Sequence, residues 1–327
     1  MKSPLRRVMV PLDGSPLSQR ALGTGAGIAR REGAALHLVT VISPLSTLPT
    51  EAGSFVHDFA VEQALEDGFR RYLDEQAGAV RVREPGISVT CSVLAGSVAG
   101  TLAMYARDED IDLIVMTTHG WGGLKRLWLG SVAQALVHRV HCPTLLMRPS
   151  GEAPGFGLRR ILVALEGADD AEVMLEPALA LGTLVDGAHY TLLQVVQLQP
   201  PLLLRIAGIP DRTVRDWVGQ IAEEADCRLD RVASRLRHRG IAADARVLVE
   251  RGAGEQILSL ARRSGCDLIV VGTRATGLER AMFGSVADKV VRGASQMVLV
   301  VPLRIESTRE VTKGQEGKAL ARAAADD

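Results

Sequence analysis

Short apolar runs alternate with longer amphipathic segments along the whole 327-residue chain. In the first half, apolar runs at 6–12, 36–42, 87–94, 111–117 and 143–148 predict β-strands, and the segments 16–32, 55–83, 97–109 and 131–140 predict helices. In the second half we expect strands near 159–165, 188–196, 242–249, 267–272 and 297–302. Runs that are apolar throughout are typical of strands covered on both faces. Because strands alternate with helices, each half is predicted to be a doubly wound, Rossmann-like α/β domain with a five-stranded parallel sheet.

The two halves repeat each other. Three blocks recur in the same order with offsets of 153 to 155 residues: RRVMVPLDGSP (6–16) with RRILVALEGAD (159–169), DLIVMTTHG (112–120) with DLIVVGTRA (267–275), and LGSVAQALVHRVHCPTLLMRP (129–149) with FGSVADKVVRGASQMVLVVP (283–302). This spacing is far longer than that of solenoid repeats and indicates a tandem duplication. We therefore predict a first domain at 1–148, a Pro/Gly-rich linker at 149–157, a second domain at 158–302 and a charged, Ala-rich tail at 303–327.

Composition excludes several classes of protein. Lys and Arg total 38 and Asp and Glu total 38, so no global basic field favours nucleic acid as a partner. The four Cys are far apart, without a Cys-x-x-Cys motif, which argues against a disulfide framework or a zinc site. Neither a signal-peptide apolar stretch nor a run of 18 apolar residues occurs. The expectation is a cytoplasmic protein without membrane insertion.

Candidate chemistry follows the first and fourth strands. In a doubly wound sheet, ligands bind outside the carboxyl ends of the strands, where the strand order reverses. Asp13 comes directly after the first strand, Gly120 comes after the fourth, and Gly130-Ser131 opens the next helix. A carboxylate suits hydrogen bonds to a ribose or base, while glycines and a helix start suit phosphates. These residues together predict a nucleotide lying along the edge of the sheet.

The phosphate charge needs a counterpart, and the chain has no Walker motif to supply one. Backbone dipoles, a metal such as Mg²⁺, or Lys125 and Arg126 would meet that charge.

Each candidate also has a purely structural interpretation. Asp13 could be the turn or N-cap residue before the first helix, and Gly130-Ser131 could be an ordinary helix start. His119 has no partner carboxylate or nucleophile beside it in the sequence, which favours a hydrogen-bonded loop residue over a catalytic one. Gly23-x-Gly25-x-Gly27 lies inside a predicted helix and fails the dinucleotide spacing, so close helix packing explains it better. Trp121 and Trp128 are interpreted as packing or lid residues.

Taken together, these residues resemble the universal stress protein family. VPLDGS and DLIVM look like the family's first and fourth strands, and Gly120, nine residues, then Gly130-Ser131 match its ATP-binding motif G-x-x-G-x9-G-[ST], except that Thr117 replaces the first Gly. The resemblance covers nearly the whole chain, twice. It implies a stress-responsive protein that binds ATP and assembles through its last strand. Carried over by position, the adenosine contacts are Asp13 and Val41, and the phosphate contacts are Gly120, Gly130, Ser131 and Val132.

The second half departs further from that motif. Glu166 stands where Asp13 does, and Ala168 stands where Ser15 does. The loop after Gly272 lacks the second Gly and is one residue short before Gly284-Ser285. A longer carboxylate and a shorter loop displace charge-assisted contacts, so we expect the first half to be the better site. The candidate residues of the second site are Glu166, Gly272, Gly284, Ser285 and Val286.

Two segments predict assembly. The apolar last strands, 143–147 and 297–301, need partners, and pairing them with each other would make one chain a pseudo-dimer. The apolar segment 199–210 is expected to cover the second site or to form a subunit contact, with a hydrophobic-ligand pocket as the alternative. A homodimer through the last strands or through 199–210 is therefore expected.

Three functions remain open at this point. The first is a regulatory stress protein that binds ATP and hydrolyses it slowly at most. The second is an enzyme of a related doubly wound class, although no Walker lysine, dinucleotide fingerprint or nucleophile elbow supports it. The third is a nucleotide-free module that acts through protein or hydrophobic-ligand contacts.

Overall fold

The computed structural model describes residues 5–43, 59–118, 129–148, 158–166, 171–183, 185, 187–197, 211–250, 252–274 and 284–303. The predicted linker and all of the predicted tail beyond Leu303 lie outside these ranges, as does the segment 199–210. Ten strands lie within them, and each begins and ends within two residues of its predicted bounds. The pattern of apolar runs therefore predicted the strands correctly.

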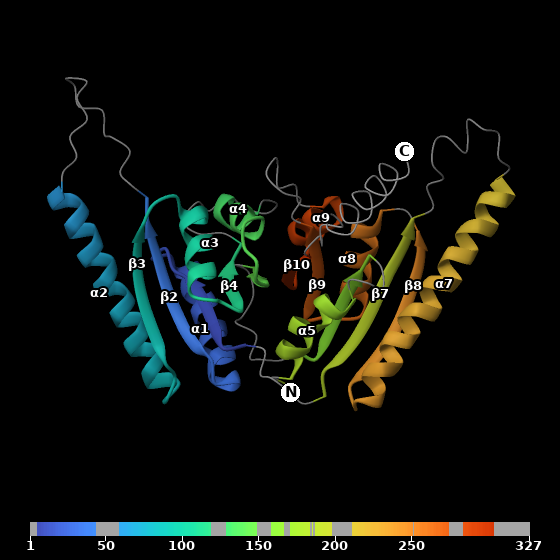
Figure 1. Ribbon diagram of the computed structural model, residues 1–327, viewed down its shortest axis with the longest axis horizontal. Helices are drawn as coiled ribbons and strands as arrows, with labels where there is room; N and C mark the ends of the chain where they lie inside the picture. Colours follow the sequence, from blue (N-terminus) through green and yellow to red (C-terminus); the bar gives the residue numbers. More distant parts are fainter. Residues whose placement is uncertain are drawn as a thin grey trace, which may run out of the picture.

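The halves contain the same succession of elements (Figure 1). The first half runs β1 (Arg7–Pro11), α1 (Pro16–Glu32), β2 (Ala35–Ile42), α2 (Phe59–Arg83), β3 (Val89–Ala95), α3 (Val98–Asp108), β4 (Leu113–Thr117), α4 (Ser131–Val137) and β5 (Thr144–Met147). The second half runs β6 (Arg160–Leu165), α5 (Ala171–Gly182), β7 (His189–Gln197), α7 (Asp211–His238), β8 (Ala242–Glu250), α8 (Ala253–Arg263), β9 (Leu268–Arg274), α9 (Ser285–Gly293) and β10 (Met297–Leu303). None of the described helices is long and apolar enough to cross a membrane.

All ten strands form one sheet in the order β3-β2-β1-β4-β5-β10-β9-β6-β7-β8. Each half keeps five parallel strands, which confirms the doubly wound fold class. The halves join where β5 and β10 pair antiparallel, with Leu145 directly opposite Leu299. The predicted pairing of the last strands is thus confirmed. The edges of β5 and β10 are therefore used within one chain. The other predicted route to a homodimer, the segment 199–210, lies outside the described residues.

The joined sheet separates two layers of helices and two hydrophobic cores. Successive residues of a strand face opposite sides of the sheet, as the pleat requires. Val10 and Leu38 belong to the core under α1, α2 and α5, whereas Met9 and Val39 belong to the core under α3, α4, α8 and α9. These assignments fix the side of the sheet on which each candidate side chain lies.

One hydroxyl in the second of these cores has no partner. Thr144 at the start of β5 is fully buried, and its Oγ1 makes no hydrogen bond. Thr144 pairs with Ile114 of β4, and Val298 pairs with Ile269 of β9. Because Ile114 and Ile269 occupy the same position in the two repeats, Val298 is the counterpart of Thr144 in the second half. The duplicated fold therefore accepts valine at this position.

We expect Thr144→Val to raise the free energy of unfolding by about 1 kcal/mol, because it removes a buried unsatisfied hydroxyl at nearly constant volume. The matched control is Thr40→Val. The hydroxyl of Thr40 is also buried but donates to Leu12 O at 2.8 Å, so this variant should lose about 1 kcal/mol. Urea unfolding measures both. Equal losses in the two variants would contradict the prediction.

Candidate functional site

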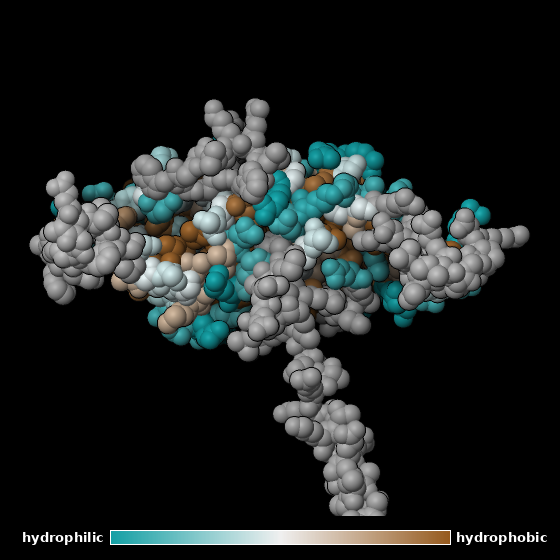
Figure 2. All heavy atoms as spheres, turned by 90° about the horizontal axis from the view of Figure 1, so that it is seen from above, coloured by the Kyte–Doolittle hydropathy of each residue, from teal (hydrophilic) through white to brown (hydrophobic). Residues whose placement is uncertain are grey.

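The strand order places a topological switch point at the carboxyl end of β1. Because β1 lies between β2 and β4, the connections that leave β1 and β4 diverge over the two faces of the sheet, as at other topological switch points. Figure 2 looks onto this edge from above and shows hydrophobic surface flanked by hydrophilic surface in the first half. β6 has the same position between β7 and β9 in the second half.

The turn after β1 is built around Asp13. Leu12 N donates to Val39 O at 2.9 Å, which holds the end of β1 against β2. The Oδ1 atom of Asp13 accepts a hydrogen bond from Ser15 N at 3.0 Å, and Gly14 takes the left-handed conformation with a φ of 79°. Ser15, not Asp13, is the N-cap of α1, because its Oγ accepts from Ser18 N. Asp13 is therefore a turn residue whose exposed carboxylate lies at the edge of the sheet.

Strand register brings Val41 and Thr118 to the two sides of Asp13. Pro11 pairs with Val39 on β2, and Met9 pairs with Ile114 on β4. Continuing both registers places Asp13 between Val41 and Thr118. Val41 is half-buried and packs against the core under α3 and α4, so its side chain lies on the α3 side of the sheet.

The residues after β4 return to this edge at the start of α4. Gly130 N donates to Thr118 O at 2.7 Å, and Thr118 N donates to Met147 O at 2.9 Å. Gly130 is the N-cap of α4, Ser131 is exposed in its first turn, and Val132 is half-buried. Since the N–H of Gly130 is already used, the predicted backbone donors for a ligand are those of Ser131 and Val132, which have no intrahelical acceptor.

The structure thus brings five of the six predicted first-half residues to one edge: Asp13, Val41, Gly130, Ser131 and Val132. The sixth, Gly120, lies outside the described residues, as do His119, Trp121, Lys125, Arg126 and Trp128.

Thr117 stands where the family's motif has its first Gly, so the direction of its β-carbon matters for the space beside the phosphates. Thr117 is the buried last residue of β4. It comes two residues after Val115, which packs in the core under α1, and residues two apart in a strand face the same side. Its side chain therefore lies on the α1 side of the sheet, opposite to Val41. The β-carbon of Thr117 consequently points away from the face on which the adenosine is expected.

The second half has the same edge with different side chains. Glu166 is exposed after β6, Gly284 is the N-cap of α9, Ser285 is exposed, and Val286 is half-buried. Gly272 occupies the place of Thr117, but an added β-carbon would lie 2.6 Å from Leu303 Cδ1, so that space is filled. The five candidate residues of the second site lie at one edge, in an arrangement that is not a copy of the first.

Two supporting residues had not been predicted. Thr40 holds the carbonyl of Leu12, and its counterpart by strand register is Gln194, whose Nε2 donates to Glu166 O at 3.2 Å. Gln194 is buried, and its Oε1 has no hydrogen-bond partner. A longer side chain therefore fills the space under the turn in the second half. Aligning the two repeats strand by strand would have revealed this difference.

Among the described residues, no group of three or more His, Cys, Asp or Glu side chains could hold a metal ion. A Mg²⁺ at the first-half edge would have Asp13 as the nearby carboxylate, and its remaining ligands would be phosphate oxygens and water, which Mg²⁺ accepts.

A polar network lies under the same face, farther from the edge. His37 Nδ1 and Tyr105 Oη are 2.9 Å apart, and Tyr105 Oη is 3.1 Å from Ser92 Oγ. Burial lowers the pKa of His37, an effect that Glu109 opposes and Arg7 reinforces. Burial also raises the pKa of Tyr105. This network couples β2 and β3 to α3 and lies at the opposite end of β2 from Val41.

The fold defines a tandem doubly wound α/β protein with one topological switch point in each half. The chain belongs to the universal stress protein family, whose profile matches it twice, over residues 4–148 and 157–302. The resemblance to this family that the sequence indicated is therefore confirmed.

Individual relatives agree with the family match. A universal stress protein of Methanocaldococcus jannaschii is 32% identical over 145 residues, covering 44% of this chain and 82% of that protein. The crystal structure of a universal stress protein from Archaeoglobus fulgidus covers 90% of this chain and 96% of its own, with a TM-score of 0.66 and 19% identity. A universal stress protein solved in complex with cAMP covers 45% of this chain and 98% of its own, with a TM-score of 0.33 and 23% identity. The cAMP is the ligand of that solved structure.

Proposed function

We propose that this protein binds an adenine nucleotide, ATP, chiefly in its first half, and acts as a regulatory stress-response protein. The observation that carries the proposal is the convergence of Asp13, Val41 and the first turn of α4 at one switch point. Asp13 and the first turn of α4 lie more than 100 residues apart in the chain, and Gly130-Ser131 match part of the family's ATP-binding motif by position.

Each group would have a separate role. The exposed carboxylate of Asp13 accepts hydrogen bonds from ribose hydroxyls, and Val41 offers an apolar contact to the base. The N–H groups of Ser131 and Val132 and the hydroxyl of Ser131 donate to phosphate oxygens. No general base is placed among the described residues of this edge, so the proposal is binding and regulation.

The second half is proposed as the weaker site. Glu166 is one methylene longer than Asp13, and Gln194 fills the space that Thr40 leaves open in the first half. The loop before Gly284 is also one residue shorter than its counterpart. Each change displaces a polar contact, and charge-assisted hydrogen bonds are sensitive to such displacement.

The test separates the two roles of Asp13. Asp13→Asn keeps an Oδ1 acceptor for Ser15 N but removes the charge, so the turn should persist. We expect ATP affinity to fall at least about tenfold, since a hydrogen bond to a charged group contributes about 1.5–3 kcal/mol. Glu166→Gln is the matched control and should change the affinity less than about twofold. Isothermal titration calorimetry measures both, and mass spectrometry identifies nucleotide released from the purified protein.

Two results would contradict the proposal. The wild type could show neither bound nucleotide nor a titration signal, which would leave an interaction module. Alternatively, Glu166→Gln could lose affinity while Asp13→Asn keeps it, which would place the better site in the second half.

A further inference from the structure

The outer flank of α7 carries a row of cations that the nucleotide edge does not use. Arg228, Arg231, Arg235 and His238, here called the arginine flank, follow one another at spacings of three, four and three residues. Such spacings place side chains on one face of a helix. The flank lines a surface hollow of about 580 Å³, together with Asp230 and Ser234.

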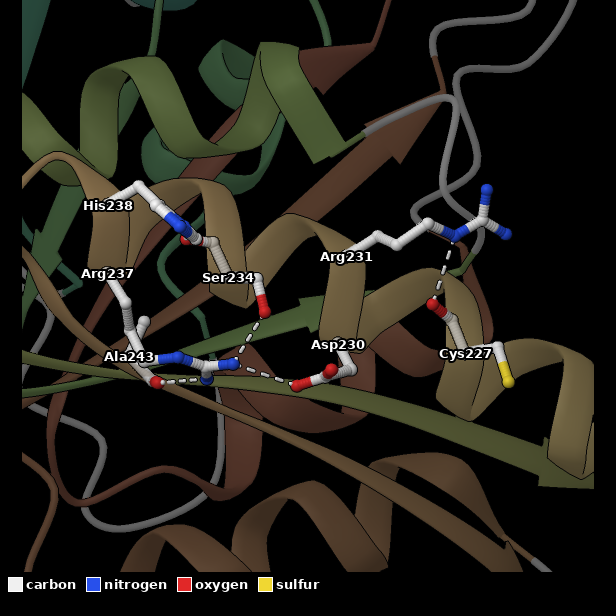
Figure 3. Close-up of polar contacts among 7 residues, drawn as sticks. All are labelled: Cys227, Asp230, Arg231, Ser234, Arg237, His238 and Ala243. Atoms are coloured by element: carbon white, nitrogen blue, oxygen red, sulfur yellow. Dashed lines mark hydrogen bonds and ion pairs between the residues drawn. The ribbon is translucent and has the colours of Figure 1, made fainter.

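The acid in this hollow is already neutralised. Arg237 Nη2 donates to Asp230 Oδ1 at 3.0 Å and to Ser234 Oγ at 2.7 Å, and its Nη1 donates to Ala243 O at 2.9 Å (Figure 3). Asp230 and Arg237 therefore form a pair that ties α7 to β8. The flank thus brings three arginines to a hollow whose lining contains one acid, Asp230. Arg228 and Arg231 also line a neighbouring hollow, which includes Glu223 and Glu224.

One of these arginines has a buried donor without an acceptor. Arg231 donates from Nε to Cys227 O at 3.2 Å, and its terminal nitrogens point away from the other residues drawn in Figure 3. The Nε of Arg228 is buried and has no hydrogen-bond partner. An unpaired buried donor costs free energy. The structure therefore holds the Nε of Arg228 in a position where an acceptor would be favourable.

The first half provides an internal reference for what the fold requires. Arg81 of α2 donates to Val89 O on β3, and Arg237 of α7 donates to Ala243 O on β8. Matching Arg81 with Arg237 aligns the two helices with an offset of 156 residues. Under this alignment the buried residues coincide: Leu73, Ala77 and Val80 of α2 match Leu229, Ala233 and Leu236 of α7. The two helices thus pack on their strands in the same way.

The arginine flank has no counterpart on α2. The alignment matches Arg228 to Tyr72, Arg231 to Glu75, Arg235 to Ala79 and His238 to Val82. Cations near a helix C-terminus are favourable, but α2 ends with Arg81 and Arg83 and has no flank. Neither packing nor the helix dipole therefore explains why three arginines and a histidine line this face of α7.

We propose that the arginine flank is a binding site for a small ligand with more than one phosphate group. Guanidinium groups match phosphate oxygens bidentately, and several adjacent arginines suit several adjacent phosphates. The volume of the hollow falls within the range of about 300–1,000 Å³ that is common for small-ligand sites. This site lies on the outer face of α7 and is separate from the switch-point edge of the first half.

The test uses inorganic tripolyphosphate as the probe, titrated calorimetrically into the whole protein at low and at high salt. The wild type should bind it, with an affinity that falls as salt rises. Arg231→Glu installs the first-half residue and should weaken binding at least tenfold. Arg71→Glu is the matched control, because Arg71 is exposed on α2 and donates from Nε to Asp67 O just as Arg231 does to Cys227 O. It should change the affinity less than twofold.

Further arms keep the result unambiguous. Urea unfolding shows whether each variant is folded, and Arg231→Gln repeats the test without reversing the charge. Asp13→Asn should keep the tripolyphosphate affinity, whatever it does to ATP. The proposal is overturned by the absence of binding to the wild type, by equal losses in Arg231→Glu and Arg71→Glu, or by a loss in Asp13→Asn. Tighter binding of a glutamate-rich peptide than of tripolyphosphate would overturn it in favour of an acidic polypeptide.

Discussion

Replacing Gly25 with alanine is expected to lower the free energy of unfolding by about 2 kcal/mol, although alanine is the better helix former. Gly25 lies in the middle of α1 and faces the sheet, and an added β-carbon would overlap Val10 Cγ2 of β1. Val115 and Leu36 lie within 4 Å of the same point, so the crowded side chain has little room to move. Overpacking costs about 1–3 kcal/mol, which exceeds the gain of about 1 kcal/mol in helix propensity.

Gly23 is the control for this prediction, because it lies in the same helix with nothing within 4 Å of its absent β-carbon. Gly23→Ala should therefore stabilise the protein by about 0.5–1 kcal/mol. Val10→Ala should rescue Gly25→Ala by removing the overlapping methyl groups. Urea unfolding measures all three variants. If Gly25→Ala were as stable as Gly23→Ala, the close packing of α1 on β1 would not determine the choice of glycine.

The stability of the protein is expected to fall as the pH drops below 6.5, with His37 as a principal cause. Burial lowers the pKa of His37 in the folded state below its ordinary value of 6.5. At pH values between the two pKa values, the unfolded chain binds the proton and the folded chain does not. Stability therefore rises with pH in this window and is lost as the pH falls, by about 1.4 kcal/mol per pH unit at most for one group.

His37→Gln tests this assignment, since glutamine offers Tyr105 a hydrogen-bonding group that does not titrate. The variant should show a flatter dependence of the urea midpoint on pH, whatever its stability at pH 7.5. His138, whose pKa is also lowered chiefly by burial, contributes in the same direction, so His138→Gln should flatten the curve as well. An unchanged slope in His37→Gln would show that His37 is protonated equally in both states.

Much of the fold could be predicted from the sequence because strands and helices leave periodic patterns in contiguous residues. The repeat of RRVMVPLDGSP in RRILVALEGAD identified two copies of one fold and suggested the pairing of β5 with β10. Asp13 and Gly130-Ser131 were found because they directly follow or precede regular elements. The family match covers both copies, over residues 4–148 and 157–302.

Other features depended on contacts that no local pattern records. The roles of Thr40 and Gln194 became visible only when strand register aligned the two halves. The N-cap of α1 proved to be Ser15, because both Asp13 and Ser15 are acceptable caps in sequence and only the backbone geometry distinguishes them. The arginine flank, too, appeared as ordinary helix charge until α2 provided a reference.

The sequence by itself determined that the chain is a duplicated α/β fold and which residues follow its first and fourth strands, because hydrophobic periodicity and turn residues act over a few positions. The tertiary structure decided the rest. It closed the edges of β5 and β10 against each other, directed Thr117 away from the face of Val41, and left the buried Nε of Arg228 without an acceptor. Those outcomes depend on which side of a sheet or helix a side chain faces and on what lies opposite, and packing between distant segments sets both.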